Sequence, residues 1–493
     1  MATETHTTSS RAARSVWAIA LNQAPQIIGA ILYIALIPRT LGAEVYGQFA
    51  FVFAIFAIFQ MLGELGYQEI FSRFVPEVRQ HSGEAGVRAM FRALFGVKLV
   101  IGLGLGVSAT LVALFLATWL TPLHALLLGL AVMARVWTMV AFPLLLGLGE
   151  TLKWSVETAW RQIVMTFLLL GIVQTHSLTL VLSAMLADEV LFLALGLWWV
   201  RGWFGNWTLS EREVGRSLSG KLEVGIWDLL RFGLTFALAN FALTLMFRIS
   251  PIVVEKLTGS RTEVGFLDLA QGGLLLIYAL LGQVAYAFVP ILTHAHLAGR
   301  ANEMPLWLGR IVRYSGLLVA LAAGGMLAVA GPIAPILFGK GFEPAANTMR
   351  AVAIGLLPLP IAWVSVVMSA VEKRPAHSVR AAFTGLIVFL AASFALKGYA
   401  SAGIGFAFGL GLTGYAIGFG ANAGRAVRAG GVGWGVTVGA ASLFLVFLIF
   451  PIQSLFLALV AWAGVALLYT LAIFSLRVVT FGEVRQILRA LRR

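Results

Sequence analysis

The sequence of 493 residues contains no cysteine, and this absence excludes disulfide bonds, thiolate metal sites and cysteine nucleophiles. Charged residues are scarce at 11% of the chain, whereas soluble globular domains are about a quarter charged. Long polar segments are also missing, because the longest connection between apolar runs covers only about residues 204–229. The sequence therefore has no room for an inserted soluble domain.

What the chain does contain is apolar sequence, with 60% hydrophobic residues and a mean hydropathy of +0.93. A membrane-spanning helix needs about 20 apolar residues, and runs of about this length recur along the whole chain. They are continuous rather than alternating, which favours helices over a lipid-facing barrel. The runs lie at about 15–38, 46–70, 94–119, 124–148, 160–177, 179–203, 230–256, 264–291, 312–337, 349–371, 381–397, 401–424, 432–452 and 453–475. The sequence predicts an all-α polytopic membrane protein with about 14 transmembrane helices.

The two ends of the chain are polar and basic. Residues 1–14 are expected to form an irregular cytoplasmic tail. The apolar stretch after them is too long for a signal peptide and lacks a small-residue cleavage site, so we interpret it as a retained first helix. At the other end, residues 476–493 form either a basic amphipathic helix on the membrane surface or a frayed basic tail.

The net charge of +14 does not indicate nucleic-acid binding, because the basic residues lie in short segments between apolar runs. With the N-terminus in the cytoplasm, 27 of the 35 Lys and Arg residues fall on the inner side and six on the outer side. The remaining two, Arg135 and Arg248, lie inside predicted helices. This imbalance predicts a multi-pass protein of the cytoplasmic membrane with both termini inside.

A weak internal repeat suggests two pseudo-symmetric six-helix lobes. The segment LGAEVYGQFAF follows the first predicted helix and LTGSRTEVGFLDLA follows the seventh, which places Gly47 and Gly265 at matching points. Two further helices would follow the second lobe. The predicted domains are the N-terminal tail at 1–14, an N-lobe at 15–203, a cytoplasmic linker at 204–229, a C-lobe at 230–424, two C-terminal helices at 425–475 and a basic cytoplasmic tail at 476–493.

Three stretches of the chain resemble a known family. The segment LGAEVYGQFAFVFAIFAIFQMLGELGYQEIFSRFVPEV, residues 41–78, contains a Leu-Gly turn at Gly42, a Tyr-Gly helix start at Gly47, an acidic-Leu-Gly motif at Glu64 and Gly66, and a downstream Arg73. Residues 229–271 and 331–359 supply two further matches in the expected order. Together they resemble the Wzx-type polysaccharide flippases of the MOP superfamily over about residues 14–420.

The resemblance also has departures. Thr235 stands where the family often has proline, and Ser250-Pro251 stands where it often has Asp-Arg. No acidic residue of the family can therefore be transferred to this helix.

This resemblance implies a flippase whose two lobes rock around a central cavity. The implied cargo is a polyprenyl-pyrophosphate-linked oligosaccharide, and the implied partners are membrane lipids and a polysaccharide polymerase or assembly machinery. It implies no cofactor and no nucleic acid. A cation-coupled drug exporter and a lipid II flippase of the same superfamily stay open as alternatives. A membrane-embedded polymerase, ligase or glycosyltransferase is disfavoured, because no Asp-x-Asp motif or large outer loop is present.

Arginines within the predicted spans are candidates for the substrate site. A buried charge costs about 2.5–3.5 kcal/mol at the bilayer centre on insertion scales and usually faces a cavity or a partner. Arg248 lies in the outer half of the seventh predicted helix and Arg135 lies midway through the fourth. Each could hold a phosphate or an acidic sugar through bidentate hydrogen bonds, or pair with a carboxylate inside the protein.

Other polar residues of the spans have two interpretations each. Asp188, Glu189 and Asp268 are ion-coupling candidates, and the alternatives are an ion pair with Arg135 or Arg161 for the first two and capping or packing for Asp268. Asn22, Gln23 and Gln26 could touch sugar hydroxyls or make hydrogen bonds between helices. His294 and His296 have no acidic or cysteine partner at zinc spacing, so no metal site is expected.

Overall fold

A computed structural model describes residues 2–171, 177–204, 226–287, 292, 304–372 and 375–476. Within these ranges it leaves out the side chains of 2–24, 26–27, 226, 235–243, 276, 279–280, 282–287, 304–306, 370, 375, 430–438 and 440. The described backbone is helical with no strand, which confirms the predicted all-α fold. Contacts between residues divide the chain into two compact units, Met1–Phe241 and Ala242–Arg493.

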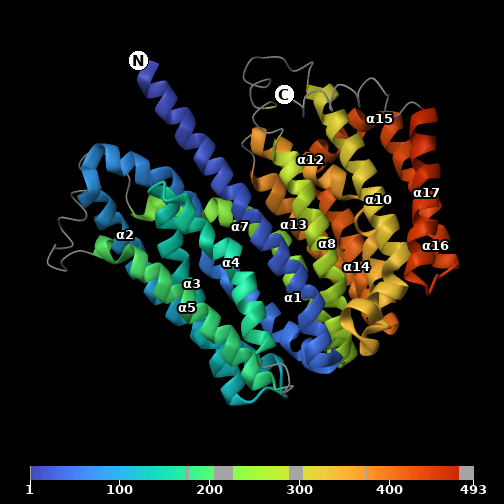
Figure 1. The fold of residues 1–493 in the computed structure, drawn as a ribbon, viewed down its shortest axis with the longest axis horizontal. Helices are drawn as coiled ribbons and strands as arrows, with labels where there is room; N and C mark the ends of the chain where they lie inside the picture. The colour runs from blue at the N-terminus through green and yellow to red at the C-terminus, as the bar shows by residue number, and fades with distance from the viewer. Residues whose placement is uncertain are drawn as a thin grey trace. The chain divides into compact units, whose positions relative to one another are not determined.

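The described residues of the first unit form five helices and the beginning of a sixth (Figure 1). They are α1 at Ala2–Glu64, α2 at Tyr67–Leu116, α3 at Pro122–Gly147, α4 at Thr151–Leu170, α5 at Leu178–Phe204 and the first part of α7 at Ile226–Thr258. Helix α3 lies at the centre of this unit, because it packs against α2, α4 and α5, while α4 also packs along α1. An aromatic-rich core fills the space between α2, α3, α5 and the start of α7.

The second unit contains the rest of α7, α8 at Arg261–Ala287 and α10 at Met304–Phe338. The short helix η2 at Lys340–Phe342 leads into α11 at Ala345–Ile354 and α12 at Leu359–Val371. The remaining elements are α13 at Pro375–Ala395, η3 at Lys397–Tyr399, α14 at Ala400–Gly418, α15 at Ala421–Ala441, η4 at Ser442–Leu445, α16 at Val446–Ile449 and α17 at Leu455–Ser475. Helix α14 packs against α8, α11 and α13, and α10 packs against α11, α15 and α17.

Seven helical stretches of the described residues are long and apolar enough to cross a membrane, or eight if the bent pair α11 and α12 forms one span. These stretches are Ile28–Leu116, Pro122–Gly147, Leu178–Phe204, Trp307–Phe338, Ala376–Ala395, Lys397–Gly418 and Leu455–Ser475. The first covers 89 residues of α1 and α2, more than one span requires. The number of 14 spans therefore stays a prediction, while the multi-pass character is confirmed.

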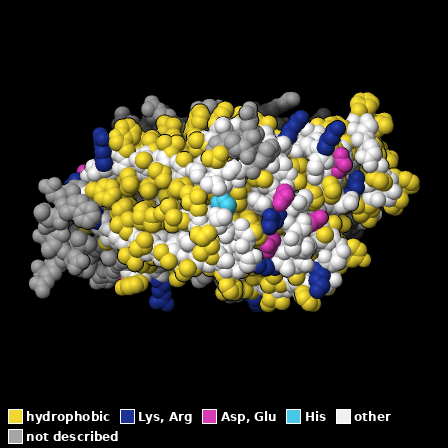
Figure 2. All heavy atoms as spheres, turned by 90° about the horizontal axis from the view of Figure 1, so that it is seen from below, with side chains coloured by type: hydrophobic (Ala, Val, Ile, Leu, Met, Phe, Trp, Pro, Cys, Tyr) yellow, Lys and Arg dark blue, Asp and Glu magenta, His cyan; other side chains and the backbone are white. Residues whose placement is uncertain are grey.

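The exposed hydrophobic side chains of the protein are consistent with a lipid environment. Large hydrophobic side chains are widely exposed, including Phe115 on α2, Phe167 on α4 and Phe456 on α17. One face of the molecule is covered mainly by hydrophobic side chains, with Lys, Arg, Asp and Glu only in scattered small groups (Figure 2). Soluble proteins rarely expose so much contiguous apolar surface.

Some helix boundaries differ from the sequence expectation. Helix α1 begins at Ala2, so the backbone of residues 2–14, which were expected to form an irregular tail, is helical. No proline lies in this stretch to interrupt the helix. The predicted first span and residues 46–64 of the second belong to one helix, α1, which is broken at Gly42, whose φ of 75° interrupts the helical path. The last residues of the second predicted span, from Tyr67, belong to α2. The polar segment after the second predicted span is also helical, as the start of α2.

The predicted linker falls mostly on 205–225, outside the described residues, as do the basic tail from 477 and both histidines, His294 and His296. The lobe boundaries stay a prediction. The two compact units meet in sequence inside α7, between Phe241 and Ala242, rather than at the linker.

Candidate functional site

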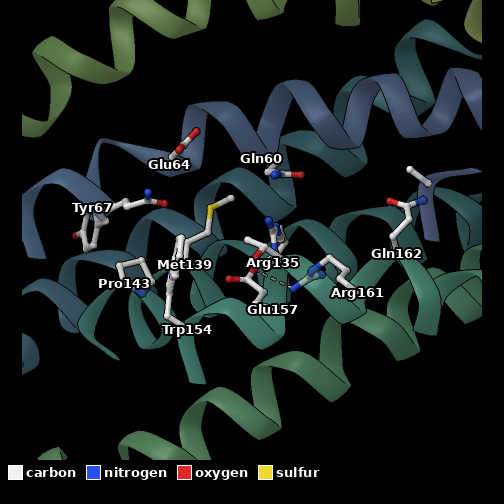
Figure 3. A pocket seen from close by; sticks show the side chains of 13 residues that line it. Gln60, Glu64, Tyr67, Arg135, Met139, Pro143, Trp154, Glu157, Arg161 and Gln162 are labelled. Atoms are coloured by element: carbon white, nitrogen blue, oxygen red, sulfur yellow. Dashed lines mark hydrogen bonds and ion pairs between the residues drawn. The ribbon is translucent and has the colours of Figure 1, made fainter. Parts of the chain in front are cut away.

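A cavity of about 270 Å³ opens in the first unit, between α1, the start of α2, α3 and α4. Its lining combines charged, amide and aromatic side chains with a few apolar ones (Figure 3). The lining residues are Ala30, Gln60, Glu64, Tyr67, Gln68, Arg135, Met139, Pro143, Trp154, Glu157, Thr158, Arg161 and Gln162. Its volume lies near the lower end of small-molecule pockets, which span about 300–1,000 Å³.

Arg135 of α3 and Arg161 of α4 lie together in the wall of this cavity and share one carboxylate (Figure 3). Arg135 Nη1 donates to Glu157 Oε1, and Arg161 Nη2 donates to the same oxygen over 3.2 Å. Glu157 and Arg161 are one helical turn apart on α4, so the helix itself aligns them. Arg135 thus lines a cavity and forms an ion pair with a carboxylate, while its role in holding a phosphate or an acidic sugar stays a prediction.

Behind the cavity wall, Arg161 binds two carboxylates of α5. Its Nη1 lies 3.3 Å from Asp188 Oδ2 and 2.6 Å from Glu189 Oε2, and its guanidinium carbon lies 4.6 Å from the centre of the Phe192 ring. Both acidic residues are buried. The structure therefore shows the predicted ion pair with Arg161, while a role of either acid in ion coupling stays a prediction.

The connected cluster carries more negative than positive charge. Two arginines, Arg135 and Arg161, face Glu157, Asp188 and Glu189. Asp188 Oδ1 is buried and has no hydrogen-bond partner among the described residues. No group of three or more His, Asp or Glu residues in the described part of the chain is arranged to hold a metal ion.

Lys98, which was counted among the 27 basic residues of the inner side, is a buried charge. Its side chain is fully buried in α2, and its Nζ donates to Gly63 O and, over 3.1 Å, to Glu64 O. It also lies 3.9 Å from the centre of the Tyr67 ring. The ammonium group thus caps the carbonyl end of α1, where a cation is favoured by the helix dipole. Its position inside an apolar run was the signal that could have identified it.

Arg161 was also counted among the 27 basic residues of the inner side, although it lies at the start of the predicted run 160–177. Helix α4 begins at Thr151, nine residues before this run. Glu157 pairs with Arg135 of α3 and Arg161 pairs with two acids of α5, so only the packing of the three helices shows that Glu157 is buried and Arg161 half-buried.

Two other predicted site residues, Arg248 and Asp268, are not among the side chains that line this cavity. Arg248 on α7 and Asp268 on α8 lie in the second unit, both half-buried and both engaged in contacts. The side chains of Asn22, Gln23 and Gln26 fall outside the described residues.

Near Arg248, α7 continues through Pro251 without a break. Proline has no N–H, so the carbonyl of Phe247 loses its usual helical partner. The Ser250 hydroxyl lies 2.8 Å from this carbonyl and 2.8 Å from Gln271 Oε1 on α8. The serine therefore satisfies the carbonyl that the proline leaves free.

The polysaccharide biosynthesis protein family matches residues 12–296, more than half of the chain. The chain belongs to this family. It has no significant sequence match among curated proteins.

Comparison with solved structures identifies the fold of this chain. The chain is similar to the lipid II flippase MurJ in an inward closed conformation, with a TM-score of 0.65, 11% identity, and coverage of 92% of this chain and 98% of that chain. It is also similar to a multidrug resistance MATE family transporter of the MOP superfamily in an inward-facing conformation, with a TM-score of 0.62, 16% identity, and coverage of 83% and 95%. This polysaccharide biosynthesis protein therefore has the fold of MOP-superfamily transporters.

The family-motif positions have clear local structures. Gly42 and Gly66 have φ values of 75° and 65°, a backbone conformation that favours glycine. Gly66 also lies so close to the carbonyl of Gly233 on α7 that a Cβ would overlap it.

The four remaining motif residues are Glu64, Arg73, Gly47 and Gly265. Glu64, directly before the turn at Gly66, lines the cavity, and the guanidinium of Arg73 lies 4.8 Å from the centre of the Phe232 ring. Gly47 and Gly265 are both buried within helices, in α1 and α8.

Proposed function

We propose that this protein is a flippase that moves a polyprenyl-pyrophosphate-linked oligosaccharide across the cytoplasmic membrane by alternating access. The observation that carries the proposal is its membership of the polysaccharide biosynthesis family together with a transporter fold. The charged and amide side chains that line the cavity of the first unit support it, since hydrophilic cargo needs polar groups to contact. In this proposal the protein performs no chemical reaction and receives its cargo from the inner leaflet.

Multi-pass insertion and the charge imbalance support a place in the cytoplasmic membrane with both termini inside. There the protein would meet membrane lipids and the lipid-linked glycan. A polysaccharide polymerase or other assembly machinery would take the flipped product on the outer side.

A lipid II flippase is the second candidate, favoured by the fold likeness to MurJ. The two candidates differ in the glycan carried by the polyprenyl pyrophosphate. A cation-coupled exporter of small molecules shares the fold as well, but the family match favours polysaccharide assembly.

The test is a flipping assay in proteoliposomes. Lipid-linked oligosaccharide extracted from the producing cells is labelled with a fluorophore on its sugar, and dithionite is added outside. In empty liposomes only the outer-leaflet fluorescence should be lost, whereas with the protein nearly all of it should be lost. A phospholipid with the same fluorophore is the control and should stay protected.

Loss of the inner-leaflet signal from lipid II but not from the oligosaccharide lipid would favour the second candidate. Loss with the phospholipid as well would indicate unspecific lipid scrambling. Protection of every lipid would overturn the flippase proposal.

A further inference from the structure

The cavity of the first unit has charges but no surplus positive charge to offer an anion. Both of its arginines are bound by carboxylates, Arg135 by Glu157 and Arg161 by Glu157 and two acids of α5. A further carboxylate, Glu64, also lines the cavity. A pyrophosphate placed here would have to compete with these carboxylates for the same guanidinium groups. The lining is therefore poorly suited to the charged part of the proposed cargo.

The uncharged polar side chains of the lining, in contrast, are well suited to bind sugar hydroxyls. Three glutamines, Gln60, Gln68 and Gln162, contribute side-chain amides that form no hydrogen bond with any other described residue. An amide offers two donors and an acceptor, which matches a sugar hydroxyl that both donates and accepts. The Thr158 hydroxyl, which donates to Ser155 O over 3.0 Å, adds a further acceptor at the cavity wall.

The amides come from different helices, Gln60 from α1 and Gln162 from α4. In Figure 3, Gln60 lies above Arg135 and Glu157, and Gln162 lies to the right of Arg161. Trp154, half-buried on α4, and Met139 of α3 add apolar surface beside these polar groups. Apolar surface with a few placed polar groups is the usual composition of a small-molecule site.

We propose that this cavity binds sugar residues of the lipid-linked oligosaccharide through Gln60, Gln162 and Trp154, and that the pyrophosphate is held elsewhere. The inference rests on the proposed flippase function and identifies the part of the cargo that this site recognises. The volume of about 270 Å³ accommodates a short stretch of glycan rather than the whole head group. The side chains of the ion cluster form a rigid part of the cavity wall. Hydrogen bonds between these charged groups and sugar hydroxyls are stronger than those between neutral groups.

The test uses cysteine protection, because the chain has no cysteine. Thr158→Cys places a single thiol in the cavity, and its rate of reaction with N-ethylmaleimide is measured in detergent. The probes are the water-soluble oligosaccharides released by mild acid from the lipid-linked pool of the producing cells, inorganic pyrophosphate, and undecaprenyl pyrophosphate. Ala85→Cys, an exposed position on α2 outside the cavity, is the matched labelling control.

We expect the released oligosaccharides to slow labelling of Thr158→Cys several-fold, with no effect of either pyrophosphate and no effect on Ala85→Cys. Adding Gln60→Ala or Gln162→Ala should shift the protecting concentration upward about tenfold, the loss expected for about 1.4 kcal/mol of hydrogen bonding. Gln80→Ala, which removes an exposed glutamine outside the cavity, should leave it unchanged.

Protection by pyrophosphate, or no protection by the oligosaccharides, would overturn the sugar site. The proteoliposome assay separates this failure from a failure of the proposed function. Flipping of the oligosaccharide lipid without protection would reject only the sugar site, whereas absence of both would reject the function as well.

Discussion

At the residue scale, the buried ion cluster of the first unit depends on a single guanidinium. Arg161 contacts carboxylates on its own helix and on α5, while Arg135 is paired with Glu157 alone. The arrangement joins α3, α4 and α5 through charges that an apolar environment would otherwise exclude. Without Arg161, the carboxylates of Glu157, Asp188 and Glu189 would have Arg135 as the remaining arginine of the cluster.

We therefore expect Arg161→Met to lower the free energy of unfolding by about 3–5 kcal/mol, the usual effect of removing one partner of a buried ion pair. Thermal unfolding in detergent measures it. Adding Asp188→Asn and Glu189→Gln should restore part of the loss, since these changes remove the unpaired negative charges. Arg79→Met breaks an exposed pair with Glu84 and should change stability by only about 0–1 kcal/mol. Equal effects of Arg161→Met and Arg79→Met would contradict this account.

At the scale of helices, glycines set the distance between α2 and α3. A Cβ on Gly106 of α2 would lie 2.8 Å from Gly129 O. A Cβ on Gly129 of α3 would lie 2.6 Å from Gly106 O and would overlap the Thr110 hydroxyl. Close approach through small residues is a principal source of helix association in membranes. Because α3 carries Arg135, this contact also positions one wall of the cavity.

Gly129→Ala should lower the free energy of unfolding by about 1–3 kcal/mol, because the added methyl meets backbone that cannot move aside cheaply. Gly104→Ala is the matched control on α2, since its Cβ would enter open space. That variant should be neutral or up to about 1 kcal/mol more stable through the higher helix propensity of alanine. Unfolding temperatures in detergent compare the two, and a Gly129→Ala protein as stable as Gly104→Ala would rule out the packing argument.

At the scale of the whole molecule, the distribution of Lys and Arg predicts the direction of insertion. Moving Lys98 and Arg161 from loops to buried positions still leaves a large excess of basic residues on the predicted inner side. The positive-inside rule counts residues of short loops near span ends, so buried charges do not contribute to it.

This orientation can be measured with two single-cysteine variants. Ala85→Cys lies on the predicted cytoplasmic side, and Tyr399→Cys, an exposed position in η3, lies on the predicted outer side. In right-side-out vesicles a membrane-impermeant maleimide should label Tyr399→Cys and not Ala85→Cys. Both should react once the vesicles are opened. The reverse pattern in sealed vesicles would show the opposite insertion.

The sequence by itself determined the all-α membrane fold, because continuous apolar runs leave the backbone no other way to satisfy its hydrogen bonds in lipid. It also identified Arg135, Asp188 and Glu189 as unusual, since charges in such runs are rare. The tertiary structure decided their partners and showed that Glu157 and Lys98 are buried and that Arg161 is half-buried. These contacts join different helices, so the periodicity of a single helix carries no record of them. For the same physical reason the cavity, built from α1, α2, α3 and α4, could be found only in three dimensions.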